Sequence, residues 1–535
     1  MRKNVLALSI AALIGGAASA GVVIPTAAGA GDAVANPAGG VYPLATALNP
    51  TVTGVGHILT VPYFTTQGTN KTLLNLVNTD NVNGKAVKLR YRGAQNSDDV
   101  FDITIYLSPG DVWTAEVAAA EDGSGISRLV TSDTSCTLPY KQDIKDLGGK
   151  FKTDRVRDAD KAQTREGYIE ILNTADVPPT LATATGALGA TANPLFAAVK
   201  HATSGATSGT PTCATAVLDL QENDLDTTAA ANANTWFTRG YNYPTGGLFA
   251  NWTVVNVAGF ASFSGTATAV RAENAAGANG VGNIVWFPQT SAAQANGANA
   301  TVATTLSADP LLLGGAVLSA KYDYPDLSTP YTGAVTASAQ ATNLTAALAT
   351  AAVSNEFITG NGFSTDWILS QPTRRYHVAV NYAAAAASRL VFRDLAAGTT
   401  SLTLGTDHYA PVNTKLNTAN DIAGTPAATV ACVVPGSLRG YNREELTKTT
   451  FVISPASALT LCGEVSVLSF NNTGDSVVGG VLTRSNLSTG TGMAEGWMRV
   501  NTPGAVAAGL PIIGYSASKV TGANLGGAWA HRTVR

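Results

Sequence analysis

Short runs in which apolar and polar residues alternate constrain this chain more than any other feature. Val87, Leu89 and Tyr91 alternate with basic residues, and the run 101–107 alternates in the same way after a turn at 93–99. A period of two places successive side chains on opposite faces of a strand. The two runs predict an antiparallel hairpin with one buried face and one face open to water. The basic side chains on that outer face are Lys88, Arg90 and Arg92.

Similar short runs, separated by glycine- and proline-rich turns, recur along the 535 residues. We therefore expect a mainly β protein, with two or more immunoglobulin-like antiparallel β-sandwich modules and long loops rich in alanine, glycine and threonine. The segment 496–500 echoes 167–171, which indicates a diverged duplication or a chance match. The expected organisation is a signal peptide at 1–20, a flexible leader at 21–48, an N-terminal sandwich domain at 49–250, a middle β and loop region at 251–360, and a C-terminal sandwich domain at 361–535.

The N-terminus has the three parts of a secretory signal peptide. Arg2 and Lys3 form a positive start, an apolar run follows at 5–14, and Ala-Ser-Ala at 18–20 is typical of a cleavage site. The apolar run is shorter than the ~20 residues that a membrane-spanning helix needs. We expect cleavage after Ala20 and secretion to the extracellular cell surface. Cleavage would lower the 33 basic residues to 31 against 36 acidic ones, a mature net charge of −5.

The four cysteines agree with export. An even number of cysteines in an oxidising compartment favours disulfide bonds, and four cysteines allow three pairings. We prefer Cys136–Cys213 and Cys432–Cys462, because each pair lies within one half of the chain. The spacing includes no Cys-x-x-Cys, so a structural zinc site is not expected.

Two acidic clusters are candidates for a calcium site. Calcium takes six to eight oxygen ligands, and carboxylates are typical ones. Neither cluster matches an EF-hand loop, and aspartate is common in solvated turns that bind nothing. Calcium therefore stays a possible cofactor. The first cluster is Asp98, Asp99 and Asp102, and the second is Glu222, Asp224 and Asp226.

The chain contains no local sequence pattern of an enzyme. It has no nucleophile elbow, no His-Glu-x-x-His, no Walker loop and no Gly-x-Gly-x-x-Gly. None of the five histidines lies within four residues of another. We expect no enzymatic activity, although a catalytic triad that forms only in the folded chain is an alternative. The basic residues are thinly spread, which argues against a nucleic-acid partner.

Four segments carry a resemblance to a known family. They are 57–67 (HILTVPYFTTQ), 74–80 (LNLVNTD), 84–92 (GKAVKLRYR) and 107–113 (LSPGDVW), and the strand 496–500 and the end 528–532 (AWAHR) fit as well. As a set they resemble secreted, surface-layer-like proteins of β-proteobacteria, a family that includes nanopod-forming members, which build tubular sheaths around outer-membrane vesicles. The resemblance spans most of the mature chain and implies a structural role without catalytic residues.

We therefore expect a secreted structural protein that self-assembles into a surface layer or into a sheath such as those around outer-membrane vesicles. Its expected partners are copies of itself in a homo-oligomeric lattice, with lipopolysaccharide or the vesicle surface as further candidates. One alternative is a monomeric adhesin or carbohydrate-binding surface protein, for which exposed tryptophans would matter. A less favoured alternative is an extracellular hydrolase, which would require His, Asp and Ser to converge in a pocket.

Overall fold

The structure is a computed structural model that describes residues 21–23, 42–286, 337–374, 414–415 and 432–535, with short gaps inside these ranges. The gaps are 96, 98, 147, 154–159, 184–186, 203–208, 219–232, 456–457, 473, 505–508 and 521–524. The described chain is mainly β and contains several antiparallel sheets, as expected. The predicted signal peptide and most of the predicted leader lie outside the described residues.

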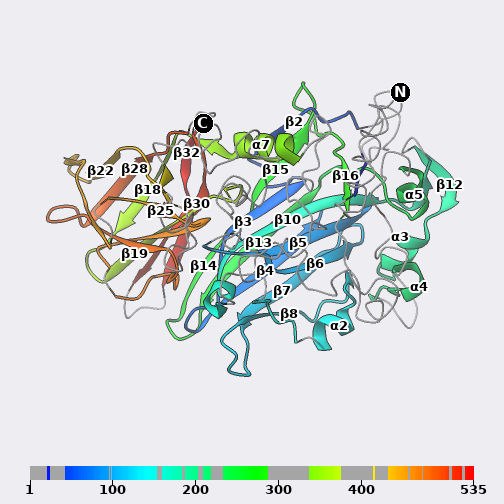
Figure 1. The fold of residues 1–535 in the computed structure, drawn as a ribbon, viewed down its shortest axis with the longest axis horizontal. Helices are drawn as coiled ribbons and strands as arrows, with labels where there is room; N and C mark the ends of the chain where they lie inside the picture. Colours follow the sequence, from blue (N-terminus) through cyan, green and yellow to red (C-terminus); the bar gives the residue numbers. More distant parts are fainter. Residues whose placement is uncertain are drawn as a thin grey trace, which may run out of the picture.

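Two facing sheets form what we call the N-terminal sandwich, drawn in blue to green in Figure 1. The seven-stranded sheet has the order β2 (Ala47–Thr51), β15 (Thr268–Glu273), β3 (Ile58–Thr65), β10 (Glu166–Val177), β5 (Gly84–Gly93), β6 (Asp99–Leu107) and β9 (Cys136–Leu138). The five-stranded sheet has the order β14 (Ala261–Thr266), β13 (Leu248–Asn256), β4 (Asn70–Asn78), β7 (Val112–Ala119) and β8 (Ser127–Val130).

Two further sheets form the C-terminal sandwich, drawn in yellow-green to red. Its five-stranded sheet has the order β23 (Thr447–Lys448), β22 (Leu438–Asn442), β28 (Glu495–Asn501), β18 (Ala352–Ile358) and β32 (Arg532–Val534). Its six-stranded sheet has the order β24 (Val452–Ser454), β27 (Arg484–Ser488), β26 (Val465–Phe470), β19 (Phe363–Ser370), β30 (Ile513–Val520) and β31 (Gly526–Ala530). The pair β26–β27 is parallel.

Short helices and small sheets complete the described chain. Asparagine followed by proline is a sequence pattern that predicts a helix start, and Asn193–Pro194 forms one here. Asn193 accepts hydrogen bonds from the first turn of α3, and Pro194 is the first residue of the helix. None of the described helices is long and apolar enough to cross a membrane. The helices are α2 (Lys141–Asp146), η3 (Lys161–Thr164), α3 (Pro194–Val199), α4 (Thr215–Leu218), α5 (Ala233–Thr238) and α7 (Ala337–Leu348). The small sheets are β1 (Gly21–Val23) with β16 (Ile284–Trp286), β11 (Thr180–Ala182) with β12 (Leu188–Ala192), β17 (Ala349–Thr350) with β29 (Leu510–Pro511), and β20 (Thr414–Lys415) with β21 (Cys432–Val433) and β25 (Leu461–Cys462).

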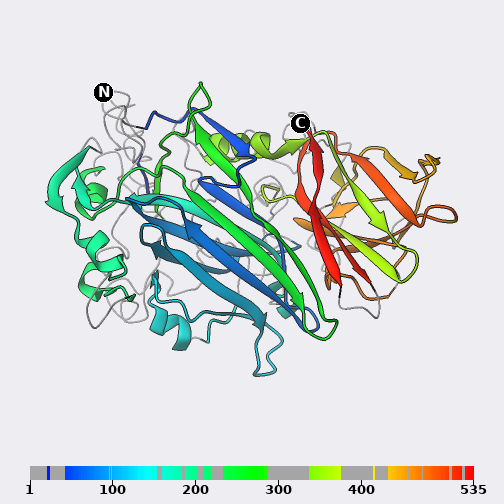
Figure 2. The same cartoon turned by 180° about the vertical axis from the view of Figure 1, so that it is seen from behind.

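One apolar core joins the two sandwiches. The core between the sheets of the N-terminal sandwich continues into the six-stranded sheet through Ile368, Val467 and Tyr515. The rings of Trp252 on β13 and Tyr515 on β30 lie 4.5 Å apart. The other face of the six-stranded sheet packs on its own five-stranded partner. Figure 2 shows the same side-by-side arrangement from behind. The six-stranded sheet is therefore a buried middle layer.

The structure corrects the predicted middle region at 251–360. Strands β13, β14 and β15 complete the two sheets of the N-terminal sandwich, whereas β18 belongs to the C-terminal sandwich. The described strands of this region thus form no unit of their own. The sequence could not show this, because strand pairing depends on partners distant in the chain, such as β4 for β13.

The predicted hairpin is confirmed, but its expected wet face is wrong. β5 and β6 pair in antiparallel register, and both strands are buried along their whole length. Lys88 forms an ion pair with Asp102 on β6, and Arg92 donates to Glu170 on β10 at 2.7 Å. Carboxylates from the flanking strands thus neutralise the basic face, which allows it to be buried. The hydroxyl of Tyr168, on β10, donates to the carbonyl of Pro372 at 3.0 Å, so the chain after β19 lies over this sheet.

Candidate functional site

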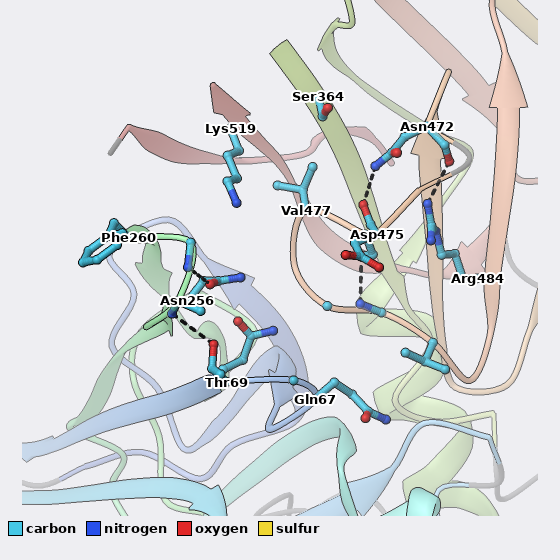
Figure 3. A pocket seen from close by; sticks show the side chains of 18 residues that line it. Gln67, Thr69, Asn256, Phe260, Ser364, Asn472, Asp475, Val477, Arg484 and Lys519 are labelled. Carbon is cyan, nitrogen blue, oxygen red and sulfur yellow. Dashed lines mark hydrogen bonds between the residues drawn. The ribbon is translucent and has the colours of Figure 1, made fainter. Parts of the chain in front are cut away.

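A pocket of about 890 Å³ opens where the two sandwiches meet, and we call it the junction pocket. Three loops build it: the β3–β4 turn, the β13–β14 turn and the 471–483 loop between β26 and β27. Figure 3 shows Asn256 and Phe260 on the N-terminal side and Arg484 and Lys519 on the C-terminal side. The volume suits a small ligand, and junctions between folded units are common places for ligand pockets.

Most polar groups of the junction pocket hold the loops together. Thr69 Oγ1 accepts from the backbone N–H of Ala258 at 3.0 Å, which joins two turns of the N-terminal sandwich. Asn70 Nδ2 donates to the carbonyl of Val478 at 3.2 Å, which ties the β3–β4 turn to the 471–483 loop. Arg484 Nη2 donates to the carbonyl of Asn472 at 2.7 Å within the C-terminal side. No histidine or cysteine is among the lining residues of the pocket, and its polar groups can hydrogen-bond a polar ligand.

A buried carboxyl group, Glu166 at the start of β10, anchors the 471–483 loop from the N-terminal sandwich. Its Oε1 accepts from the backbone N–H groups of Val481 and Leu482 at 2.9 and 3.3 Å, and from Gln67 Nε2 at 2.9 Å. Its Oε2 accepts from the Tyr63 hydroxyl at 3.3 Å. Burial raises the pKa of Glu166 to about 7, although these hydrogen bonds favour the ionised form and oppose the rise.

A second buried carboxyl group, Asp366 on β19, holds the same loop from the C-terminal sandwich. It accepts from the Ser476 hydroxyl and from the backbone N–H of Val478 at 3.2 Å. Burial raises the pKa of Asp366, and hydrogen bonds from serine hydroxyls oppose the rise. The loop is therefore held on both sides by carboxyl groups that are costly to ionise, and both sandwiches contribute to its position.

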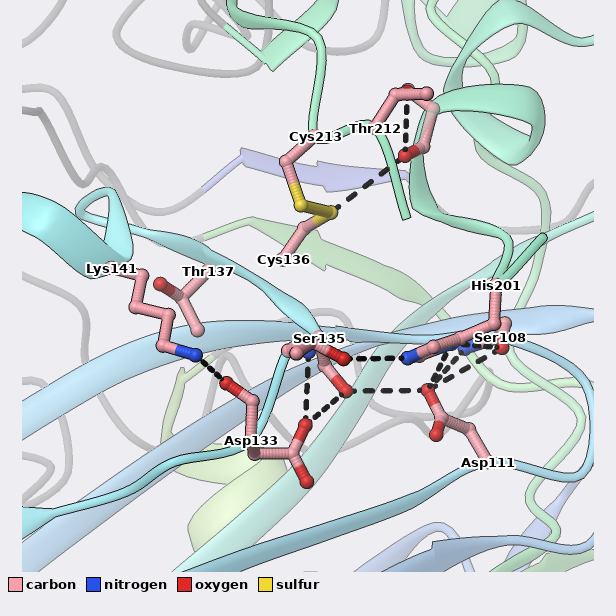
Figure 4. The surroundings of a disulfide bond; sticks show 12 residues. Ser108, Asp111, Asp133, Ser135, Cys136, Thr137, Lys141, His201, Thr212 and Cys213 are labelled. Atoms are coloured by element: carbon pink, nitrogen blue, oxygen red, sulfur yellow. Dashed lines mark hydrogen bonds and ion pairs between the residues drawn. A yellow bond between two sulfur atoms is a disulfide. The ribbon is translucent and has the colours of Figure 1, made fainter. Parts of the chain in front are cut away.

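His201 lies beside Ser108 and Asp111, near the disulfide, as Figure 4 shows. Both Ser108 Oγ, at 2.9 Å, and Asp111 Oδ2, at 3.4 Å, face the Nδ1 atom of His201. A catalytic triad instead needs the nucleophile at one ring nitrogen and the carboxylate at the other. Thr134 Oγ1 lies 3.3 Å from Nε2, but Thr134 is exposed, and neither it nor His201 is among the lining residues of the described pockets. This geometry favours a structural role in fixing the 108–111 turn.

Two other histidines are buried and face backbone groups. His57 lies 3.0 Å from the carbonyl of Gly280 and accepts from the N–H of Ala272 at 3.1 Å. Burial lowers the pKa of His57 to about 3 and that of His531 to about 4. Both rings are therefore neutral at physiological pH and act as internal hydrogen-bonding groups.

The structure describes two of the six residues predicted to bind calcium. Asp99 and Asp102 lie on β6 and are buried, and Asp102 is ion-paired with Lys88. Across the described residues, no three His, Cys, Asp or Glu side chains gather in a way that could hold a metal ion. A paired, buried carboxylate is a poor calcium ligand, so Asp102 does not favour the prediction. The remaining candidates, Asp98, Glu222, Asp224 and Asp226, lie outside the described residues.

The first predicted disulfide is confirmed. Cys136 on β9 and Cys213 are bonded, which links the segment after α3 to the edge of the seven-stranded sheet (Figure 4). For the second predicted pair, β21 and β25 place Cys432 opposite Cys462 in antiparallel register. Cys462 is disulfide-bonded. This backbone register is the one that a Cys432–Cys462 bridge requires.

Tryptophan positions divide into core and surface. The buried tryptophans are Trp113, Trp236, Trp252 and Trp367. Trp497 and Trp529 instead expose about half of their surface, at 42% and 52%.

The junction pocket was not predicted from the sequence. Its sequence signals are turn glycines, which resemble those of any other turn. They are Gly68, Gly259, Gly479 and Gly480.

Comparisons with protein-family models, with curated proteins and with solved structures found no match to this chain.

Proposed function

We propose that this chain is a secreted structural protein of the cell surface that self-assembles into a surface layer or sheath, the role that its resemblance to surface-layer-like proteins implies. The observation that carries the proposal is a pair of exposed apolar side chains at the edges of the two sheets of the C-terminal sandwich. Val452, at the start of edge strand β24, is 72% exposed, and Leu446, in the β22–β23 turn six residues earlier, is 61% exposed. We call Leu446 and Val452 the assembly edge.

An exposed apolar edge is unusual for a protein that stays monomeric. A sheet edge carries free N–H and C=O groups, and natural proteins commonly protect it with lysine, proline or a covering segment. In the described chain, β24 has only β27 as a sheet partner, so its outer edge is free. Contact of this edge with a different surface of the next copy would be a heterologous interface, which is the kind that propagates into sheets or tubes.

The test is assembly of the mature chain from Gly21, followed by negative-stain microscopy and light scattering. We expect sheets or tubes for the natural chain and dispersed particles for the double variant Leu446→Lys/Val452→Lys. Because both side chains are exposed, the variant should keep the melting temperature of the natural chain. The matched control is Leu525→Lys, which changes a side chain that is also exposed, at 64%. Monomers of the natural chain at every concentration would overturn the proposal.

The same assembly experiment, repeated with calcium and with a chelator, tests whether calcium holds the lattice together. If calcium holds the lattice together, a chelator should dissolve the sheets, and added calcium should restore them. Sheets that are indifferent to chelator would remove calcium from the proposal and leave assembly intact.

We also propose that both sandwiches have an immunoglobulin-like fold. Its support is the facing of mainly antiparallel sheets in both sandwiches. In this proposal the chain is not an enzyme, and the placement of Ser108 and Asp111 on one nitrogen of His201 supports that view.

A further inference from the structure

The outer face of the five-stranded C-terminal sheet carries three arginines in one row across the strands. Arg439 on β22 lies directly opposite Arg499 on β28, Arg499 lies opposite Ser354 on β18, and Ser354 lies opposite Arg532 on β32. All three arginines are exposed. Directly opposed residues of neighbouring strands place their side chains on the same face, so the three guanidinium groups share one surface.

No carboxylate neutralises this row within the described chain. Arg499 Nε donates to Asn501 Oδ1 at 3.1 Å, and Arg439 Nη1 donates to the Tyr441 hydroxyl at 3.4 Å, but neither acceptor belongs to a carboxylate. The described ion pairs include none of the three arginines. Like charges directly opposite each other destabilise a sheet. This row therefore lowers the stability of the fold, and no ion pair within the described chain offsets the repulsion. The expected mature chain has a net charge of −5, which makes the concentration of positive charge more notable.

The neighbouring row is aromatic. Tyr441 on β22 and Trp497 on β28 are cross-strand partners whose rings stack with centroids 4.4 Å apart. Trp497 remains 42% exposed, and Glu356 on β18 follows it in the same row. The face therefore combines a line of cations with an exposed, rigid aromatic stack.

We propose that this arginine face, defined by Arg439, Arg499, Arg532 and the Tyr441–Trp497 stack, binds a linear acidic polysaccharide. Guanidinium groups bind carboxylates in bidentate fashion, and they do so while remaining charged at any physiological pH. Strands lie ~4.8 Å apart, so the row from Arg439 to Arg532 extends over about 14 Å of flat surface. A single phosphate would need donors that converge on one point, whereas a row of cations suits a polymer whose charge repeats along its length.

The aromatic row favours a saccharide over a nucleic acid. Single-stranded nucleic acids are held by basic grooves together with aromatic rings whose faces are free to stack on bases. Here Tyr441 already covers one face of Trp497. An exposed amphipathic ring beside hydrogen-bonding cations instead suits the mixed apolar and polar surface of a sugar chain.

The test is binding of polygalacturonate, a linear polymer of carboxylated sugars, to the mature full-length chain by calorimetry at low and at physiological salt. We expect the triple variant Arg439→Gln/Arg499→Gln/Arg532→Gln to lose affinity by about tenfold or more, and binding by the natural chain to weaken with added salt. The matched control is Arg128→Gln/Arg271→Gln/Arg443→Gln, which changes the net charge equally at arginines that already have carboxylate partners. This variant should lose less than about twofold in affinity, because a carboxylate already neutralises each of its three arginines.

Three results would overturn the proposal. They are an absence of polygalacturonate binding, an equal loss of affinity in both triple variants, and tighter binding of single-stranded DNA or of neutral dextran than of polygalacturonate. Circular dichroism of both variants distinguishes a loss of binding from a loss of folding. The inference is separate from assembly: a monomeric protein that binds the polymer would uphold it, and a lattice that fails to bind would overturn it alone.

Discussion

At the scale of single residues, buried charge is the main departure from a simple β protein. Lys88, Arg90 and Arg92 lie on one face of β5 and are completely buried, and carboxylates on β6 and β10 are their ion-pair partners. Glu166 is buried without a basic partner among its hydrogen bonds. The energetic consequences differ. Removal of one partner from a buried pair leaves an uncompensated buried charge, whereas a buried carboxyl group without a basic partner resists ionisation.

Glu166 should make the stability of the protein depend on pH. Its pKa rises from 4.5 in the unfolded chain to about 7 in the folded one, so the folded state holds the proton more tightly. The stability that this proton contributes is complete below about pH 4.5 and is lost as the pH rises to about 7. The variant Glu166→Gln, which is neutral at every pH, should match the natural chain at pH 4.5 and exceed it at pH 8 by about 3 kcal/mol at most. Urea unfolding at both pH values measures this difference.

The control for this prediction is Glu116→Gln, because Glu116 is partly exposed and pairs with Lys71 at the surface. The control should shift stability by less than about 1 kcal/mol at either pH. A stability difference between Glu166→Gln and the natural chain that is the same at pH 4.5 and pH 8 would show that Glu166 does not titrate in this range.

The pair Lys88–Asp102 should be costly to break from one side. Lys88→Met leaves the Asp102 carboxylate buried with its closest cation removed, so we expect a loss of about 3–5 kcal/mol in the free energy of unfolding. The double variant Lys88→Met/Asp102→Leu should recover most of that loss, because both charges are then gone. Denaturant titration tests both. A single variant no less stable than the exposed-pair control Lys71→Met would contradict this explanation.

At the scale of elements, close strand packing explains why the similar segments 167–171 and 496–500 both begin with glycine. Gly167 on β10 and Gly496 on β28 both follow a glutamate at the start of a strand that has partners on either side. A β-carbon on Gly167 would lie 1.7 Å from the carbonyl oxygen of Arg92, and one on Gly496 would lie 1.9 Å from that of Tyr441. Close approach of the neighbouring backbone thus requires glycine at both positions. Duplication itself stays a prediction.

The disulfide is the element-scale feature with the clearest energetic consequence. Cys136 and Cys213 are 77 residues apart in sequence, and closing a loop of this size removes much of the entropy of the unfolded chain. The variant Cys136→Ser/Cys213→Ser should lose about 4 kcal/mol in the free energy of unfolding, in a chain-entropy treatment. Thermal unfolding of the oxidised natural chain and of the variant measures the loss. An unchanged free energy of unfolding in the double variant would contradict this expectation.

At the scale of the whole molecule, the two sandwiches share one core. Tyr515 of the C-terminal sandwich packs against Trp252 of the N-terminal one, and Glu166 and Asp366 hold the 471–483 loop from opposite sides. Unfolding of one sandwich would expose the apolar surface that the other sandwich buries against it, which is unfavourable in water. The molecule should therefore respond to heat as a single unit.

Calorimetry tests this cooperativity. We expect one heat-absorption peak for the mature chain, whose calorimetric and van't Hoff enthalpies agree. Tyr515→Ala should lower the free energy of unfolding by about 3–5 kcal/mol, because it removes a large buried ring from the shared core. Tyr441→Ala, on the outer face of the C-terminal sandwich, is the control and should leave the peak nearly unmoved. Two separate peaks for the natural chain would show that the sandwiches unfold independently.

The sequence by itself determined those features that depend on residues close together in the chain. The alternation at 87–91 and 101–107 predicted the β5–β6 hairpin, and Asn193 with Pro194 predicted the start of α3, because strand period and helix capping are local. Cys136–Cys213 also came from the sequence, since the two cysteines lie in one half of a chain expected to be oxidised.

Only the tertiary structure decided what covers each face. The alternating pattern of β5 indicates an apolar face and a basic face. It cannot show that Asp102 and Glu170, on neighbouring strands, neutralise the basic face. The junction pocket and the row of Arg439, Arg499 and Arg532 likewise bring together residues far apart in the sequence. Periodicity specifies which way a side chain points along its own strand, whereas pairing and packing between distant strands specify what it meets there.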